Sequence, residues 1–251
     1  GKTTLACNLA VALKAKSSVD LKVCLVDLDV SFGNAEAVLQ VDAKRNILDW
    51  GTFGPEEFDQ GLVSELVTRH KSGLDLVLSP VRAHEATQIK GELAGKVLKT
   101  LSRYYDVIIC DVGPYLQADS TIVALDMATK ILIIGTTDVP TLRNLHNCTS
   151  TFDVLGVEQA KIRMVFNRMI KKHGLSMKEV NQYIPYPIVG KIYEDESVQR
   201  LANDGKLAVL DFPNGAFAAG ILKTVNSIIP VCLEEKKRGL FGWFKRRRDK
   251  Q

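Results

Sequence analysis

Hydrophobic and polar residues follow two alternating patterns along this chain. Short, nearly continuous apolar runs predict strands covered on both faces, at 22–27, 74–79, 106–111, 131–136, 162–167 and 188–192. The segments between them have apolar residues at helical spacing and predict helices over 3–14, 58–70, 91–103, 120–128, 142–155 and 196–203. Because strands joined by helices require right-handed crossovers, the pattern predicts an α/β fold with a doubly wound, mostly parallel sheet and helices on both faces.

Length and composition favour one globular domain. Of the 251 residues, 46% are hydrophobic and 25% are charged, which excludes a disordered or fibrous chain. No apolar run approaches the roughly 18 residues that cross a bilayer, so we expect no transmembrane helix. No secretory leader is visible, and the start at Gly1 leads us to expect an N-terminally truncated chain.

The cysteines and histidines lack the spacing of a disulfide framework or a metal site. The cysteines are Cys7, Cys24, Cys110, Cys148 and Cys232, and the histidines are His70, His84, His146 and His173. Unpaired thiols are typical of the cytosol. Cys24 and Cys110 lie in strand-like runs, where we expect buried, inert thiols. The histidines are expected at surface or turn positions.

The charge is divided unevenly between the body and the end of the chain. The net charge is +4, yet residues 236–250 hold eight Lys or Arg and one Asp, a net charge of +7. The rest has 25 basic and 28 acidic side chains, a net charge of −3. An acidic body with a basic end indicates an anionic surface as the partner of that end.

The basic end is also amphipathic. At about 100° per residue, four bulky side chains fall within an arc of roughly 160°: Leu240, Phe241, Trp243 and Phe244. This pattern is typical of an interfacial anchor on an anionic membrane. A solubilising terminus whose aromatic residues dock on the core is one alternative, and nucleic-acid binding is a less favoured one. We therefore divide the chain into a globular domain, 1–230, and a basic amphipathic tail, 231–251.

Polar residues end several predicted strands, and the chain opens on a phosphate-binding motif. In a doubly wound sheet, ligands bind at the carboxyl ends of the strands, where Asp27, Asp29, Asp111 and Asn167 fall. Each could alternatively be a turn residue. Residues 1–4 read GKTT at the start of a predicted helix.

That tetrapeptide matches the second half of a P-loop. In a P-loop, backbone N–H groups and a helix N-terminus hold phosphates, the lysine (here Lys2) reaches the β- and γ-phosphates, and the hydroxyl residue (here Thr3) binds Mg²⁺. The run VIICD at 107–111 fits a Walker B strand, which is apolar and ends in a carboxylate near the metal. Both motifs together predict nucleotide binding.

With these motifs the chain resembles the MinD/ParA family of deviant Walker A P-loop ATPases. The family's loop reads KGGxGKT[TS]; this chain carries its end, and the earlier glycines, the signature lysine and the preceding N-terminal strand are absent from it. The resemblance implies ATP and Mg²⁺ as cofactors, with Gly1, Lys2, Thr3 and Thr4 around the phosphates. It also implies Lys2, Asp29 and Asp111 as the catalytic residues.

Three further segments carry the resemblance. Residues 26–34, VDLDVSFGN, resemble the family's DxDxxxGN switch; the match implies that Asp29 positions the attacking water and that Asp27 holds the water shell of Mg²⁺. Asp111 would be the Walker B carboxylate, although DVGP departs from the usual DxPxG order. Residues 165–168, VFNR, resemble the NR motif, which implies that Asn167 and Arg168 lie at the adenine. Residues 190–195, GKIYED, parallel a GxIPxD loop near the base and add Asp195. For Asn167, a strand-end cap is the structural alternative.

The resemblance also implies a biological role. Family members use slow hydrolysis as a switch, form a homodimer with ATP, and act from the cytoplasm at the inner face of the cell membrane. The sequences of residues 27–34, 78–80 and 136–144 are similar to those of the CpaE/TadZ branch, which acts in Flp/Tad-type pilus assembly and secretion. Septum-site or flagellar placement is the alternative within the family. A non-hydrolysing scaffold and a bacterial tyrosine kinase of this fold are the alternatives of other classes; such kinases end in a tyrosine cluster, whereas the six tyrosines here are internal.

Overall fold

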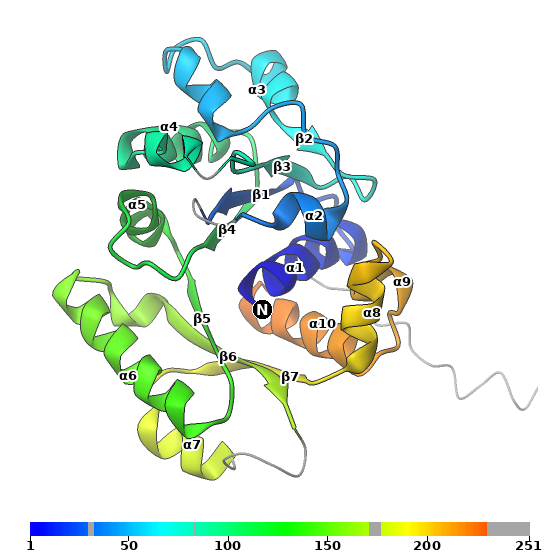
Figure 1. The fold of residues 1–251 in the computed structure, drawn as a ribbon, viewed down its shortest axis with the longest axis vertical. Helices are drawn as coiled ribbons and strands as arrows, with labels where there is room; N and C mark the ends of the chain where they lie inside the picture. The colour runs from blue at the N-terminus through cyan, green and yellow to red at the C-terminus, as the bar shows by residue number, and fades with distance from the viewer. Residues whose placement is uncertain (30–32, 83, 171–176, 230–251) are drawn as a thin grey trace, which may run out of the picture.

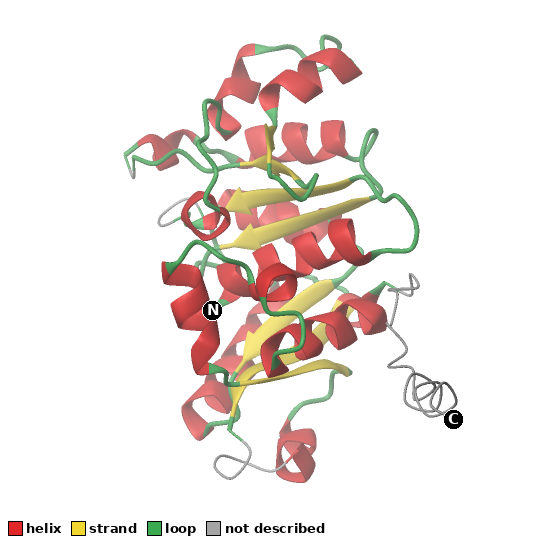
Figure 2. Cartoon of the chain, turned by 90° about the vertical axis from the view of Figure 1, so that its right-hand side faces the viewer, coloured by secondary structure: helices red, strands yellow, loops and turns green. Residues whose placement is uncertain are grey.

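A layer of strands lies between layers of helices in the computed structural model, which describes residues 1–29, 33–82, 84–170 and 177–229 (Figures 1 and 2). The strands are β1 (Val23–Leu28), β2 (Thr68–Arg69), β3 (Asp75–Val77), β4 (Val107–Val112), β5 (Ile131–Gly135), β6 (Ile162–Met169) and β7 (Ile188–Tyr193). The helices are α1 (Lys2–Lys16), α2 (Ala35–Leu39), α3 (Gln60–Leu66), α4 (Gly91–Leu101), α5 (Asp119–Met127), α6 (Val139–Val154), α7 (Met177–Tyr183), α8 (Glu196–Asn203), α9 (Ala208–Asp211) and α10 (Ala216–Ile228). Short 3-10 helices are η1 (Ile47–Thr52), η2 (Glu85–Gln88) and η3 (Gln159–Lys161). The predicted tail, with Leu240, Phe241, Trp243 and Phe244, lies outside the described residues, as do His173 and Cys232.

Hydrogen bonds divide the strands into two sheets, in the order β2-β3-β1-β4 and β5-β6-β7. Every strand pair is parallel except β2 with β3. The predicted α/β fold with mostly parallel strands is therefore confirmed. The continuous sheet that we expected is interrupted, because β4 and β5 lie at the ends of separate sheets and do not pair with each other. The described chain opens directly on α1, without a strand before it.

Successive side chains along β1 point to opposite faces of the sheet and pack in different cores. Val23 and Leu25 pack with α1, α2, α9 and α10 in one core, whereas Cys24 and Val26 pack with η1, α3 and α4 in a second. A third core lies between α6, α7, β5 and β6. Because successive residues of a strand face opposite sides, Asp27 shares the α1 face with Val23 and Leu25.

The helix predicted over 58–70 is shorter than expected. Helix α3 ends at Leu66, and the next residues turn into β2, which pairs antiparallel with β3. Arg69 fixes this pairing, because its Nε lies 2.7 Å and its Nη2 3.0 Å from the two carboxylate oxygens of Asp75. The turn from α3 into β2 is thus accompanied by an ion pair between residues six apart, which the helical pattern did not indicate.

The described cysteines are free thiols, as predicted. Cys7 and Cys24 are buried, whereas Cys110 and Cys148 are half-buried. Burial raises the pKa of Cys110 to about 12, which keeps this thiol protonated. His70 lies in the β2–β3 turn, but it is buried rather than at the surface. Among the residues that the structure describes, no helix is long and apolar enough to cross a membrane.

Candidate functional site

Two carboxylates meet at the carboxyl ends of β1 and β4. Asp27 and Asp111 occupy paired positions in the parallel register of these strands. Both lie within the strands, and both are nearly inaccessible, at 2% and 3% exposure. The pairing confirms that the ends of these strands bring their acids together at one edge, on the side of the sheet where α1 begins.

Asp111 is the carboxylate that lacks a full set of partners. Its side chain hydrogen-bonds the hydroxyl of Thr3 and lies in the positive field of Lys2. Its Oδ2 atom is buried and has no hydrogen-bond partner among the described residues. Burial raises the pKa of this carboxyl, against the opposing effects of Thr3 and Lys2. An unpaired buried carboxylate oxygen beside a threonine hydroxyl fits a hard divalent cation such as Mg²⁺.

The protein side of such a metal site is sparse. Within the described residues, no group of three or more His, Cys, Asp or Glu could hold a metal ion. Thr3, Asp27 and Asp111 supply one hydroxyl and two carboxyl groups instead. Mg²⁺ usually keeps several waters and takes one or two carboxylates together with substrate phosphates, so this set fits a nucleotide-bound Mg²⁺.

Asp27 is held by backbone donors on both oxygens. Oδ1 accepts a hydrogen bond from the Asp29 N–H and Oδ2 accepts one from the Ala35 N–H, each at 3.1 Å. Burial nevertheless raises the pKa of Asp27 to about 7, and the nearby charge of Asp111 acts in the same direction. The Ala35 bond ties the first turn of α2 to this carboxyl.

This raised pKa predicts that the ligand-free protein loses stability as the pH rises. Between the ordinary value of 3.8 and the folded value of about 7, the folded state holds a proton on Asp27 that the unfolded state has released. The unfolding free energy should therefore fall by up to about 1.4 kcal/mol per pH unit in this range. The stabilisation is complete below about pH 4 and is lost as the pH passes about 7.

Urea unfolding of the wild type and Asp27→Asn at pH 5, 6 and 7 checks this prediction. The stability difference between the two proteins should change with pH, because only the wild type carries the titrating carboxyl. A difference that stays constant from pH 5 to pH 7 would contradict it.

Asp29 lies where the loops after β1 and β4 meet. A Cβ atom placed on Gly113 would stand 2.9 Å from Asp29 Oδ1, and one on Gly33 would stand 2.8 Å from Asp27 Oδ2. Both glycines therefore allow backbone to approach a carboxylate closely. Ser79, which lies shortly after β3, donates from Oγ to the carbonyl of Asp27 at 2.8 Å. Asp29 thus lies beside the segment that follows the Walker B strand.

The start of α1 provides the anion-binding half of the site. Gly1 is the N-cap, no side chain caps the helix, and its first turn contains no acidic residue. Uncapped N–H groups at the start of a 15-residue helix favour a phosphate. Lys2 is exposed there, while Thr3 and Thr4 are half-buried.

The predicted base-recognition residues lie beside this helix start. Asn167 is 8% exposed at the end of β6, and its Nδ2 atom would lie 3.3 Å from a Cβ on Gly1. Arg168 follows Asn167 directly and is exposed. The Glu194 N–H donates to Met169 O, which brings the loop containing Asp195 next to this strand end.

The carboxylate of Asp195 is engaged as a helix cap. Oδ1 accepts hydrogen bonds from the Ser197 N–H at 3.0 Å and the Ser197 hydroxyl at 2.6 Å, at the start of α8. Oδ2 accepts one from the Phe217 N–H at 3.5 Å, which links α8 to α10. These bonds lower the pKa of Asp195, with the Ser197 hydroxyl contributing most. A contact of this carboxylate with a base therefore remains a prediction.

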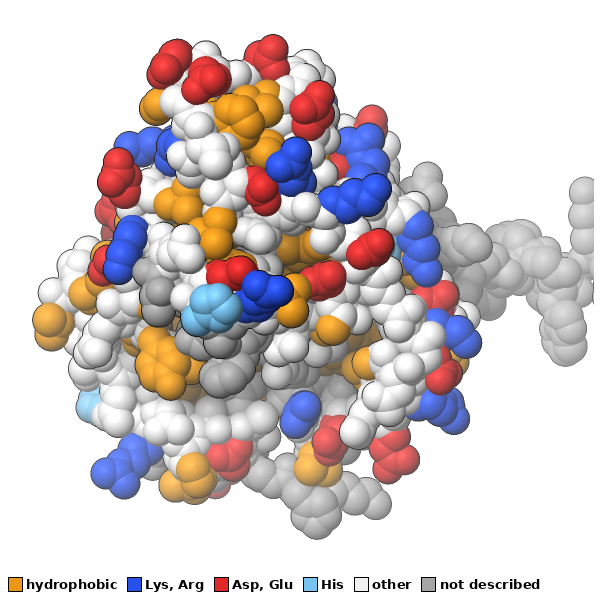
Figure 3. All heavy atoms as spheres, turned by 45° about the horizontal axis from the view of Figure 1, so that its top comes forward, with side chains coloured by type: hydrophobic (Ala, Val, Ile, Leu, Met, Phe, Trp, Pro, Cys, Tyr) orange, Lys and Arg blue, Asp and Glu red, His pale blue; other side chains and the backbone are white. Residues whose placement is uncertain are grey.

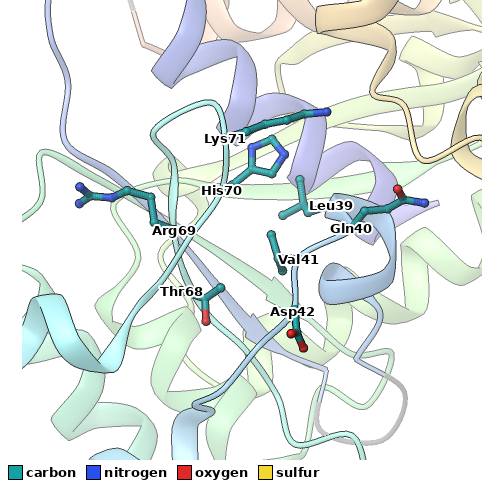
Figure 4. A pocket seen from close by; sticks show the side chains of 8 residues that line it. All are labelled: Leu39, Gln40, Val41, Asp42, Thr68, Arg69, His70 and Lys71. Carbon is teal, nitrogen blue, oxygen red and sulfur yellow. The ribbon is translucent and has the colours of Figure 1, made fainter.

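Two cavities lie elsewhere. One of about 320 Å³ lies between the end of α2 and the β2–β3 turn, at the amino end of β3. Figure 4 shows the Arg69 side chain pointing away from the other labelled side chains, and His70 beside Leu39. The other, of about 510 Å³, is lined by residues around 181–191, including Lys191. Neither is lined by residues of the site described above.

Comparison with known proteins shows the family of the chain. Residues 1–209 match the CobQ/CobB/MinD/ParA nucleotide binding domain. The chain belongs to this family. The septum site-determining protein MinD of Buchnera aphidicola is 28% identical over 265 residues, covering 96% of this chain and 94% of that protein.

Solved structures show the same fold. A ParA family ATPase from Chlorobium tepidum superposes with a TM-score of 0.81 at 21% identity, over 89% of this chain and 92% of that one. A septum site-determining MinD from Pyrococcus horikoshii, complexed with Mg-ADP, superposes with a TM-score of 0.75 at 20% identity, over 91% of this chain and 90% of the other. The MinD/ParA-like P-loop ATPase fold expected from the motifs is thereby confirmed.

Some residues that build the site were not predicted to do so. Asn8 is 2% exposed on α1, where its Nδ2 donates to Thr4 O at 2.8 Å and its Oδ1 accepts the Val209 N–H at 3.3 Å. It thereby ties the helix start to α9. A polar residue in the otherwise apolar run 5–13 was the available signal for Asn8. For Ser79, the signal was its position as the last residue of the strand predicted over 74–79.

Proposed function

We propose that this protein binds ATP with Mg²⁺ at the carboxyl edge of its strands and hydrolyses it slowly, as a switch. The observation that carries this proposal is the buried, unpartnered Oδ2 of Asp111 beside Thr3 and Lys2. Membership of the nucleotide binding family supports it. Mg²⁺, when bound, would neutralise phosphate charge, and Thr3, Asp111 and the water-mediated Asp27 would hold it.

The remaining side chains have roles that suit phosphoryl transfer. The reaction needs positioning and charge stabilisation more than covalent chemistry. Lys2 and the N–H groups from Gly1 to Thr4 would bind the phosphates, and Asp29 would orient the attacking water. Asn167, Arg168 and Asp195 would surround the base.

Equilibrium binding of ATP to the complete gene product, with and without Mg²⁺, tests the site. Lys2→Ala should weaken binding by about 10- to 100-fold, because it removes a charge-assisted contact to phosphate. Lys16→Ala is the matched control at the other end of α1 and should bind within about twofold of the wild type. Equal losses in both variants, or Mg²⁺-independent binding, would argue against this site.

We infer that the ATP-bound protein pairs with a second copy across the same edge. Large apolar side chains are exposed just after four of its strands: Val81 (85%), Tyr115 (63%), Val139 (67%) and Ile170 (50%). Burying such side chains against a partner is favourable. A homodimer closed over the nucleotide would do so at the site itself.

We further propose that the protein acts at the inner face of the cell membrane through its tail. Leu240, Phe241, Trp243 and Phe244 with the flanking Lys and Arg would bind an anionic surface from the cytoplasm. On the face that Figure 3 presents, the body has no comparable patch of positive charge. Its Lys and Arg side chains are interspersed with Asp and Glu there. The sequences of the segments 27–34, 78–80 and 136–144 favour a Flp/Tad-type pilus or secretion machine as the assembly that the protein positions. Septum placement is the second candidate, which the full-length similarity to MinD favours.

Co-sedimentation with vesicles that contain anionic lipid tests the tail. Trp243→Glu should reduce vesicle binding at least about tenfold, because it removes a large apolar side chain and adds a negative charge. Vesicles of zwitterionic lipid alone are the control and should bind little of either protein. Unchanged binding of the variant would rule out the tail as the anchor.

A further inference from the structure

Arg168 has a backbone conformation that its side chain disfavours. Its φ is +51°, and among the described residues only Gln40, with φ +48°, is another non-glycine residue in this region. The left-handed conformation is costly for a residue with a Cβ atom, so the surrounding structure must hold it. Such strain often lies at functional sites.

A β-bulge explains why Arg168 adopts this conformation. Phe166 pairs with Lys191 and Met169 pairs with Tyr193, so two residues of β6 lie opposite one of β7. Phe166 and Met169 both pack in the third core, although residues three apart on a regular strand face opposite sides. The extra residue restores the alternation, and a bulge of this kind redirects the side chains beside it.

The bulge fixes the orientation of the Asn167 carboxamide. The Arg168 N–H donates a hydrogen bond to Asn167 Oδ1 at 2.9 Å. A carboxamide turned by 180° would set its NH₂ group against this N–H, two donors facing each other. The side chain is 8% exposed, and its Nδ2 faces the start of α1. The oxygen and the nitrogen of Asn167 are therefore not interchangeable.

We propose that the Arg168 backbone N–H, held by the left-handed bulge, makes the site prefer adenine to guanine. The inference rests on the proposed function, in which Asn167 contacts the base. Adenine presents a donor, its N6 amino group, beside a ring-nitrogen acceptor; guanine presents the acceptor O6 at that place. A fixed carboxamide can pair its oxygen with N6 and its NH₂ with the ring nitrogen, whereas O6 would face the carboxamide oxygen. A carboxamide free to turn would offer its NH₂ to O6 and lose this discrimination.

Two substitutions at Arg168 separate the backbone from the side chain. Arg168→Gly and Arg168→Val both remove the guanidinium, but glycine adopts a positive φ readily and a β-branched residue does so least. The measurement is the ratio of the Kd for GTP to the Kd for ATP in the complete gene product. Arg168→Val should give a ratio roughly tenfold lower than that of Arg168→Gly, because both variants lack the guanidinium and differ in how readily they hold the positive φ.

Controls keep the test decisive if Arg168→Val folds poorly. Arg168→Ala has an intermediate cost at positive φ and should give an intermediate ratio. Gln40→Gly relieves the same backbone strain at a position outside the site and should leave the ratio unchanged. Equal ratios in the Gly, Ala and Val variants, with ATP still bound, would overturn the role of Arg168 alone. Absence of ATP binding in the wild type would instead overturn the proposed function.

Discussion

Asp29→Ala should lower the steady-state rate of ATP hydrolysis by about 10²- to 10⁴-fold while leaving the Kd for ATP within about threefold. Asp29 lies directly after β1, and its Oδ1 is close enough to Gly113 that a Cβ there would stand 2.9 Å away. It is thus placed between the segments that follow β1 and β4, where an attacking water would need orientation. Loss of the carboxylate removes that orientation and leaves the phosphate contacts of α1 in place.

Phosphate release and ATP binding, measured side by side in the complete gene product, check this prediction. Asp204→Ala is the matched control, since Asp204 is an exposed acid 4.0 Å from Lys206. It should hydrolyse ATP at the wild-type rate. Equal background rates in the wild type and Asp29→Ala would favour a scaffold that binds nucleotide without hydrolysing it. ATP-dependent tyrosine phosphorylation would favour a kinase.

Asp111→Asn should abolish the stabilisation that Mg-ATP gives, without destabilising the ligand-free protein. Asp111 is a buried carboxyl, and its raised pKa shows that the charged form is unfavourable in the folded protein. An amide of the same shape carries no charge. The ligand-free variant should therefore unfold at the wild-type midpoint or above it. At about 100 times its Kd, a ligand stabilises a protein by about 2.7 kcal/mol, and this gain should disappear with the metal contact.

Thermal unfolding with no ligand, with ATP and chelator, and with Mg-ATP checks the second prediction. A structural role for Asp111 predicts the opposite pattern, a lower midpoint in all three conditions. Asp106→Ala serves as the control at the other end of β4, where the carboxylate accepts the Lys22 N–H at 2.8 Å. Its loss should lower all three midpoints by a similar amount.

The sequence predicted the strands closely because their signal is local. Continuous apolar runs placed β1, β4 and β6 within about two residues of their observed bounds. The two-residue strand β2 carries too few residues for such a signal. Its residues pair with β3, and Arg69 binds Asp75 across the turn between the two strands. The interruption between β4 and β5 likewise depends on which strands pair. The sequence of either strand alone does not determine its pairing partner.

The site was predictable as a set of residues and not as an arrangement. Strand ends and the GKTT motif indicated Asp27, Asp29, Asp111 and Asn167, since the carboxyl ends of parallel strands meet at one edge. For Asp195 the motif indicated a base contact, which stays a prediction; the structure adds that its carboxylate accepts hydrogen bonds from Ser197 and Phe217. The hydrogen bond from Phe217 depends on α10 packing beside α8, and the motif at 190–195 does not show that packing.

The sequence by itself determined the fold class, the helix start that suits phosphate and the acids that end the strands, because each depends on patterns of a few neighbouring residues. Only the tertiary structure decided which of the two buried acids has both carboxylate oxygens hydrogen-bonded. Asp27 finds backbone donors from residues 29 and 35, and Asp111 keeps an unpartnered oxygen. The tertiary structure likewise decided that a bulge lies at Arg168, whose N–H donates to Asn167 Oδ1. Burial, register and hydrogen-bond partners arise from contacts between distant segments, so these properties follow from how the elements pack.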